Sequence, residues 1–285
     1  MQAPDFVAVG HVTLDETATG LRPGGAALYA AVTAHRLGCS VGLLTSFGPD
    51  FPIEVFPSGV HVVSAPAART TTFRHEQTSR GRQLTLLSRA TDLMVDALPA
   101  PWRDASLALL SPVAGEVDPY LAAEFAEAAV SAAVQGWLRQ RGPGGVITPA
   151  QWDDAAQVLP HLQAVFLSSE DIGALEEGPL KWFQEIPVGI VTLGQAGALL
   201  FVNGERYSIP ADTARQTDAT GAGDVFAAAF LIHYQHEGDP WEAAAFAACA
   251  AASSVEVEGL AGIPDRPTLE ARLSRYRKRL FGVTP

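Results

Sequence analysis

The sequence predicts an α/β domain in which helices cover both faces of a mostly parallel sheet, with a small β-sheet lid inserted in it. Short apolar runs that suit buried strands alternate with helical segments. The 285 residues are 48% hydrophobic, which is enough for one large core. A polar segment interrupts the alternation, and neither a repeat nor a linker divides the chain. We therefore expect one domain over residues 1–285.

The first half of the chain supplies three of the expected strands and one helix. The strands are the apolar runs FVAVG, SVGLLTSFG and VHVVSAP, at residues 6–10, 40–48 and 60–66. The helix covers residues 25–38 and is expected to end at Gly38, in the C′ position that glycine favours.

A polar segment between these strands and the rest of the chain indicates a hairpin. Residues 69–90 are rich in Thr, Arg and Gln, and a Ser-Arg-Gly turn separates two strand-like halves. A polar hairpin among buried strands suggests a flap or lid over a binding site. An ordinary edge hairpin is the alternative, and the residues alone leave both readings open.

The second half continues the alternation of strands and helices. A hairpin is expected around Asn203-Gly204, because this dipeptide favours a tight two-residue turn. The remaining strands are expected at residues 106–112, 131–137, 164–169 and 188–194, and the helices at residues 119–129, 149–159, 170–177, 224–234 and 241–254.

Charge and composition exclude several classes of partner. The net charge of -12 provides no basic surface for a nucleic acid, so none is expected as a partner. The alanine-rich run AAAFAACAAASS is too short to cross a bilayer, and the first residues do not resemble a signal peptide. Two cysteines cannot form a disulfide framework. We expect a cytoplasmic protein that does not bind membranes.

Four common functional motifs are absent or occur in the wrong context. Neither of the two lysines follows a glycine-rich turn, which excludes a P-loop. Phe226 stands where a dinucleotide fingerprint requires its third glycine. Ser40 lies in GCSVG, but a helix precedes this segment and a strand follows it, the reverse of a nucleophile elbow. His233 and His236 have no further ligands nearby that would complete a zinc site.

The segment DATGAGDVFAAAFL, residues 218–231, carries the strongest functional signal. Gly221 and Gly223 allow a sharp turn, and the helix expected from Asp224 adds unpaired amides, so the turn can bind an anion. The Asp224 carboxylate is either the N-cap of this helix or a base for an attacking hydroxyl. Phosphoryl transfer needs both an anion hole and such a base. The helix end is expected to keep Asp224 ionised.

DATGAGDVFAAAF closely resembles the C-terminal signature of the ribokinase-like (PfkB-type) carbohydrate kinase family. Three further segments resemble that family in the same order: PGGAALYAAVTAHRLG, VTLGQAGALLF and GLAGIP. The resemblance covers nearly the whole chain. It implies a Rossmann-like sheet, a β lid formed by residues 11–23 and 68–92, and transfer of the ATP γ-phosphate to a hydroxyl with Mg²⁺ as cofactor.

The resemblance also implies the roles of individual residues. Asp224 corresponds to the catalytic base, and Gly221 with the amides of Ala222, Gly223 and Asp224 corresponds to the anion hole. Asp15 matches the aspartate that holds acceptor hydroxyls. The acceptor is also expected to contact Thr13, Gly24, Gly25, Tyr29, Gln135 and Arg139, although a strand end and a surface arginine explain the last two equally well. The nucleotide side is expected to comprise Ser168, Thr192, Gly194, Gly197 and Gly259, and the metal side Glu170 and Asp171.

Three positions depart from the family pattern. Tyr29 replaces the usual Asn after the Gly-Gly pair, SSED at residues 168–171 replaces Asn-x-x-Glu, and Ala219 stands where Thr is common. Tyr29, VQGWLR and the 69–90 segment look more like the inositol-kinase branch. We predict an ATP-dependent kinase of a small sugar or polyol, with a myo-inositol or nucleoside kinase as the alternative. A non-catalytic sugar- or nucleotide-binding regulator is the alternative from another class. The exposed edges of the lid would permit a homodimer.

Overall fold

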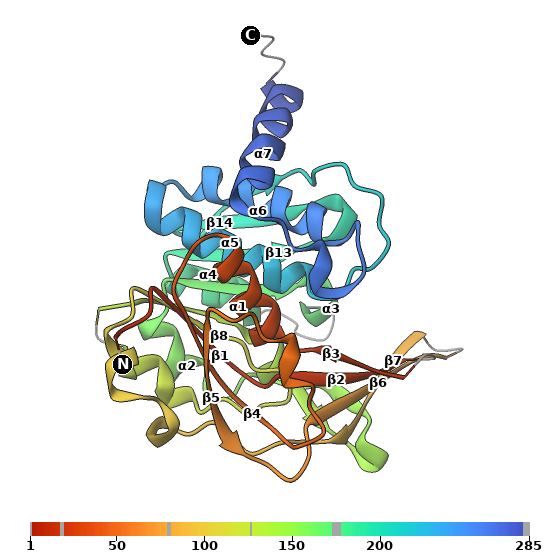
Figure 1. The fold of residues 1–285 in the computed structure, drawn as a ribbon. Coiled ribbons are helices and arrows are strands. Elements are labelled where there is room, and N and C mark those ends of the chain that lie inside the picture. Colours follow the sequence, from red (N-terminus) through yellow and green to blue (C-terminus); the bar gives the residue numbers. More distant parts are fainter. Residues whose placement is uncertain (1, 18–19, 79–80, 126, 173–177, 282–285) are drawn as a thin grey trace.

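The computed structural model describes residues 2–17, 20–78, 81–125, 127–172 and 178–281. Within these residues nine strands form one sheet in the order β15-β14-β13-β12-β9-β8-β1-β4-β5 (Figure 1). In this order, each strand from β13 through β12, β9, β8, β1 and β4 to β5 pairs in parallel with its neighbour. Strands β14 and β15 add to the β13 edge in antiparallel pairing. The bounds are β1 Phe6–Val9, β4 Val41–Phe47, β5 Val60–Pro66, β8 Leu107–Leu110, β9 Ala129–Ala133, β12 Ala164–Ser168, β13 Val188–Thr192, β14 Ala198–Val202 and β15 Glu205–Ile209.

Helices cover both faces of this sheet, as predicted. One face packs against α1 (Ala26–Arg36), α5 (Ala222–Glu237), α6 (Pro240–Ser254) and α7 (Arg266–Phe281) (Figure 1). The other face packs against α2 (Ala155–Val158), α4 (Gly178–Glu185) and several short 3₁₀ helices. Strand β1 lies inside the sheet between β4 and β8, where Phe6 pairs with both Val41 and Leu107, and all four of its residues are buried. Such a strand needs to be apolar on both sides, which explains the continuous run FVAV.

A second, small sheet contains β2 (Thr13–Thr17), β3 (Gly20–Gly24), β6 (Thr71–Thr78) and β7 (Gly81–Ser88), in the order β3-β2-β6-β7. These four strands extend together to one side of the main body (Figure 1). The predicted hairpin is confirmed as β6 and β7, and its turn at Ser79–Arg80 lies outside the described residues. Two further strands, β10 (Arg139–Arg141) and β11 (Ile147–Pro149), pair antiparallel with each other. An isolated antiparallel β-bridge pairs Thr85 of β7 with Val146, just before β11.

A buried polar network anchors the small sheet to the main sheet. The His11 ring, fully buried just before β2, contacts the Thr71 hydroxyl at 2.7 Å and the Thr91 carbonyl at 2.8 Å. The Glu116 carboxylate accepts hydrogen bonds from the backbone amides of His11, Val113 and Ala114. The segments that enter and leave the small sheet are therefore held at fixed positions.

Several predicted helices are wrong or incomplete. The alanine-rich segment 119–129 forms a 3₁₀ helix over Pro119–Glu124 in place of an α-helix, and its last residue, Ala129, begins the central strand β9, so packing overrides helix propensity. In the segment 149–159 only α2 is helical, and Pro160 follows it closely. The strand expected at 131–137 ends at Ala133 and continues as a 3₁₀ helix. The helix expected at 170–177 begins as α3 (Ser169–Ile172), and residues 173–177 are outside the described part.

Three other predictions from the sequence agree with the structure. α1 is followed by Gly38 at positive φ, β14 and β15 turn at Asn203-Gly204, and α5 and α6 occupy the two apolar helical segments. The charged helix α7 was not expected from the sequence. No helix in the described ranges is both long and apolar enough to cross a bilayer.

Candidate active site

The glycine-rich turn takes the conformation that its sequence requires. Gly221 is the N-cap of α5 and adopts the left-handed conformation, with φ 75°. A Cβ on Gly221 would lie 2.3 Å from Cδ1 of Tyr29, because the tyrosine ring packs directly beneath the turn. Both the backbone angle and the contact therefore require glycine at this position.

The first turn of α5 presents amides, as the sequence predicts. The Val225 amide makes the first helical bond, to the Gly221 carbonyl at 2.9 Å, and the Ala222 amide donates to the Ala219 carbonyl at a longer 3.3 Å. The amides of Gly223 and Asp224 have no acceptor within the described part of the chain, as is usual for the start of a helix. Gly223 is exposed, so this end of the helix is accessible to an anion.

Asp224 is not the N-cap of α5. It lies in the first turn, half-buried, and the N-cap position belongs to Gly221. Burial raises the pKa of Asp224 to about 7; the charge of Arg139 lowers this pKa and that of Asp171 raises it. This upward shift is opposite in direction to the effect expected of the helix end, and its largest cause is desolvation. A carboxylate with a pKa near 7 is suited to accept a proton at neutral pH.

Two of the predicted residues, Arg139 and Asp171, act on Asp224 through their charges. Asp171 accepts hydrogen bonds from the Ser168 amide at 2.9 Å and the Ser168 hydroxyl at 2.8 Å, and a longer one from Gln135 at 3.4 Å. Arg139 donates to the Val113 carbonyl at 3.4 Å, and its charge also acts on Asp224. Gln135 and Arg139 are therefore part of the same polar cluster. Glu170 is exposed beside this cluster.

The predicted acceptor residues gather where the small sheet meets α1. Asp15 is buried on β2, and its Oδ1 lies 3.5 Å from Nε2 of His75 on β6. A Cβ on Gly24 would lie 2.7 Å from Oδ2 of Asp15 and 3.1 Å from the Thr13 hydroxyl. Gly25 has φ 103° and its Cα lies so close to β2 that a Cβ would be 2.5 Å from the His11 carbonyl. The Gly-Gly pair thus lets α1 begin directly against the Asp15 strand.

Tyr29 joins this acceptor group to the glycine-rich turn. The side chain is 1% exposed, and its hydroxyl is buried with no hydrogen-bond partner among the described residues. Burial, followed by the charge of Asp218, raises the pKa of the Tyr29 hydroxyl well above its ordinary value. Charges on Arg22, Asp224 and Asp15 also act on it, so the hydroxyl faces the polar site.

The predicted nucleotide-side residues lie at the ends of the last strands. Thr192 ends β13, and Gly194 and Gly197 flank a 3₁₀ turn that leads into β14. Gly259 begins another 3₁₀ turn, after α6, and its amide donates to Oδ2 of Asp218 at 3.1 Å. This hydrogen bond joins the loop after α6 to the glycine-rich turn.

Sequence reasoning missed two residues that organise the turn. Asp218 accepts the Thr220 amide at 3.0 Å through Oδ1, and Arg22 of β3 contacts its Oδ2 at 2.8 Å. The Asp218 signal was readable, since an Asp two residues before a turn amide favours such a bond. The position of Arg22 could not be read from the sequence, because 196 residues separate it from Asp218.

Comparison with known proteins shows the family of this chain. Residues 5–266 match the pfkB family carbohydrate kinase. This chain belongs to the pfkB family. It is 25% identical to a cytidine kinase of Thermococcus kodakarensis over 84% of this chain and 91% of that protein. The family and the relatives are kinases, which identifies this pfkB chain as a phosphotransferase.

Solved structures show the same ribokinase-like fold. A pyrophosphate-dependent kinase of the ribokinase family, complexed with a pyrophosphate analog and myo-inositol, has a TM-score of 0.78 at 21% identity and covers 93% of this pfkB chain and 99% of its own. Arabidopsis thaliana ribokinase, complexed with ribose and ATP, has a TM-score of 0.71 at 19% identity, with 95% and 99% covered.

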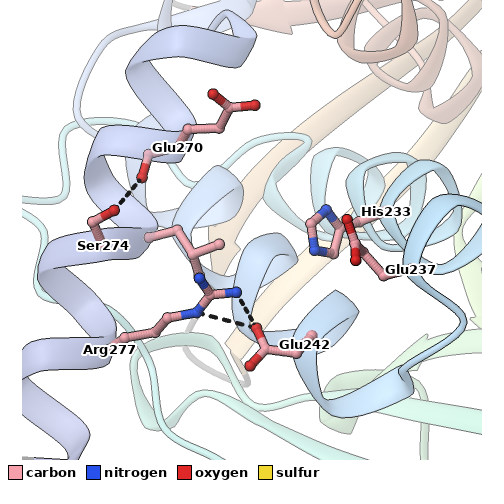
Figure 2. A pocket seen from close by; sticks show the side chains of 7 residues that line it. His233, Glu237, Glu242, Glu270, Ser274 and Arg277 are labelled. Carbon is pink, nitrogen blue, oxygen red and sulfur yellow. Dashed lines mark hydrogen bonds and ion pairs between the residues drawn. The ribbon is translucent and has the colours of Figure 1, made fainter.

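A cavity elsewhere on the molecule contains none of the predicted site residues. It measures about 340 Å³ and lies between α5, α6 and α7. Figure 2 shows that Arg277 contacts Glu242 there and that His233 lies on the α5 side. The His233 ring stacks on Phe246 at 4.2 Å, and the described residues form no group of three or more metal-binding side chains.

Proposed function

We propose that this protein transfers the γ-phosphate of ATP to a hydroxyl of a small sugar or polyol. The observation that carries the proposal is the glycine-rich turn, where a half-buried carboxylate with a raised pKa stands beside accessible helix-terminal amides. The acceptor lies between Asp15 and Asp224, with Gly24 and Gly25 allowing it to approach the backbone.

In this mechanism Asp224 removes the proton from the acceptor hydroxyl as the phosphoryl group arrives. The amides of Gly223 and Asp224, and that of Ala222 once its long bond to Ala219 opens, stabilise the charge on the phosphoryl oxygens. Arg139 lowers the pKa of Asp224 and so favours the deprotonated base. Asp15 orients the acceptor by accepting hydrogen bonds from its other hydroxyls.

The donor side of the proposal uses Thr192, Gly194, Gly197 and Gly259 for ATP. Glu170 and Asp171 would hold Mg²⁺, which when bound would supply positive charge to the donor phosphates. The residues present fit this, because Glu170 is exposed and Asp171 supplies a carboxylate whose partners are neutral. Pyrophosphate is the alternative donor, since one of the structurally similar kinases uses it.

The small sheet serves as a lid in this proposal, because it carries Asp15 and His75 on one face and closing it would exclude water from the phosphoryl group. A homodimer through the lid stays a prediction. Such a dimer would use the β3 edge, where Leu21 is exposed, because Thr85 of the opposite edge strand already pairs with Val146.

A donor and acceptor panel tests the proposal. We would measure formation of the phosphorylated acceptor with Mg-ATP or Mg-pyrophosphate on ribose, fructose, myo-inositol, cytidine and adenosine. Transfer from ATP to a sugar or polyol that is lost in Asp224→Asn supports the proposal. If the enzyme preferred cytidine or adenosine, the proposed acceptor would be wrong and a nucleoside would take its place. If it preferred pyrophosphate, the proposed donor would be wrong.

A further inference from the structure

A single arginine connects the small sheet to the glycine-rich turn. Arg22 lies on β3, opposite Asp15 of β2 in the strand pairing. Its Nη1 lies 2.8 Å from Oδ2 of Asp218, and its Nη2 donates to the Thr220 hydroxyl at 3.1 Å. A third contact, from Nη1 to Glu258, measures 3.2 Å. One guanidinium therefore contacts three groups on two loops that lie far from it in the sequence.

Asp218 transmits this contact to the turn. Its Oδ1 accepts the Thr220 amide, directly before Gly221, and its Oδ2 accepts the Gly259 amide as well as Arg22. The Asp218 and Thr217 amides are in turn held by the Val255 carbonyl. Among the described residues, the other donors to Asp218 are the neutral Thr220 hydroxyl and the backbone amides of Thr220 and Gly259, so Arg22 is the one side chain that adds a positive charge to this carboxylate.

The burial of the contacts identifies the bond that matters. The Asp218 side chain is 13% exposed and that of Arg22 is 28% exposed, whereas Glu258 is 75% exposed. An exposed ion pair contributes little, so the contact with Glu258 is secondary. The contact with Asp218 is a charge-assisted hydrogen bond in a half-buried place, and such bonds are about twice as strong as neutral ones.

We infer that Arg22 is a positioning residue for phosphoryl transfer, which orders the anion-binding turn when the small sheet is closed over it. This inference rests on the proposed function. Arg22 acts through Asp218 and Thr220, and it is not required to touch the transferred group. Closing the lid then does two things together: Asp15 reaches the acceptor, and Arg22 fixes the turn whose amides receive the phosphoryl oxygens.

The test compares Arg22→Gln with a matched control in the same sheet. Arg74 of β6 forms a similar pair with Glu16, at 2.9 Å, but this pair stays within the small sheet. Arg74→Gln therefore removes an arginine–carboxylate pair without reaching the turn. Both variants are compared with wild type by thermal unfolding, by hydrogen exchange of the amides in residues 218–225, and by kcat and KM on the acceptor that the panel identifies.

We expect Arg22→Gln to speed exchange of residues 218–225 about tenfold, the factor that corresponds to losing one such hydrogen bond. We expect kcat to fall about 10- to 100-fold, less than the roughly 10²–10³-fold loss for removing an anion-hole donor itself, because Arg22 acts through Asp218, with KM for ATP changed less than about threefold. Arg74→Gln should match wild type in both. Arg22→Lys keeps one charged contact and should be intermediate.

A double-variant cycle separates positioning from general stability. If Arg22 acts through Asp218, adding Asp218→Asn to Arg22→Gln should change kcat little further, whereas independent roles give multiplying effects. The inference would be overturned if the two substitutions multiplied their effects on kcat, or if Arg22→Gln equalled Arg74→Gln in amide exchange and kcat. If wild type transfers phosphate to no acceptor, the proposed function fails, and the exchange experiment still decides whether Arg22 orders the turn.

Discussion

Replacing Gly221 with alanine tests the geometry of the turn most directly. Gly221 has φ 75°, and an L-residue in this conformation costs about 1–2 kcal/mol. The added Cβ would also lie 2.3 Å from Cδ1 of the buried Tyr29 ring, and overpacking of this kind costs about 1–3 kcal/mol. Together these effects predict that Gly221→Ala lowers the free energy of unfolding by about 2–5 kcal/mol.

Gly223→Ala is the matched control for this measurement. Gly223 is two residues away in the same helix, and a Cβ there would have no atom within 4 Å. Alanine is favoured over glycine within a helix by up to about 1 kcal/mol, so Gly223→Ala should be as stable as wild type or slightly more stable. Urea unfolding followed by tryptophan fluorescence measures both variants, with the m-value compared to detect any change in the unfolding transition.

A third variant separates the two causes. In the background Tyr29→Leu the ring is gone, so Gly221→Ala should cost only the backbone part, about 1–2 kcal/mol. The reasoning would be refuted if Gly221→Ala unfolded at the same urea concentration as Gly223→Ala. The packing part of the reasoning alone would be refuted if Gly221→Ala lowered the free energy of unfolding by the same amount with tyrosine or leucine at position 29.

Four further predictions concern Asp224. Asp224→Asn should lower kcat by about 10²–10⁴-fold while ATP binding, measured by calorimetry, persists. Because the base must be deprotonated and burial raises the pKa of Asp224 to about 7, kcat/KM should fall as the pH drops below about 7, and a flat profile down to pH 5 would contradict the assignment. Arg139 lowers this pKa, so Arg139→Gln should move the acid limb to higher pH, and an unmoved limb would separate Arg139 from the base. The pKa of Asp224 in the folded protein lies above its unfolded value near 4, so ionisation of Asp224 lowers the stability of the fold as the pH rises from about 4 to 7. At pH 8, Asp224→Asn should therefore be more stable than wild type by about 1–2 kcal/mol, after allowing for solvent screening. A variant less stable than wild type would contradict the raised pKa.

Those parts of the fold that depend on local pattern could be predicted from the sequence. The buried strands β1 and β4, the apolar edge strand β5, the Asn203-Gly204 hairpin and the glycine that ends α1 each carry a signal within a few residues. The segment 119–133 could not, because its alanines suit a helix and a buried strand equally, and only the neighbouring strands β8 and β12 decide between them. Helix α7 was missed because its polar composition hides the few residues, such as Leu269 and Tyr276, that pack on the core.

The candidate site divides in the same way. Asp224 and the glycines around it were recognisable because the turn is contiguous in sequence. Two features of the site that the sequence did not predict both come from residues distant in the sequence. The pKa of Asp224 depends on burial and on Arg139 and Asp171, and the order of the turn depends on Arg22. A single sequence contains no local signal for either effect.

Several unfavourable features lie around this turn, as expected of a functional site. Gly221 has a left-handed backbone, Asp224 is a carboxylate with a raised pKa, and both the Tyr29 hydroxyl and Arg22 Nε are buried without a partner among the described residues. Elsewhere the fold can satisfy a buried charge well, since Glu116 accepts three backbone amides near the base of the small sheet. A structure that can pair a buried carboxylate so fully, yet leaves polar groups unpaired beside Asp224, retains there the donors and acceptors that a substrate would engage.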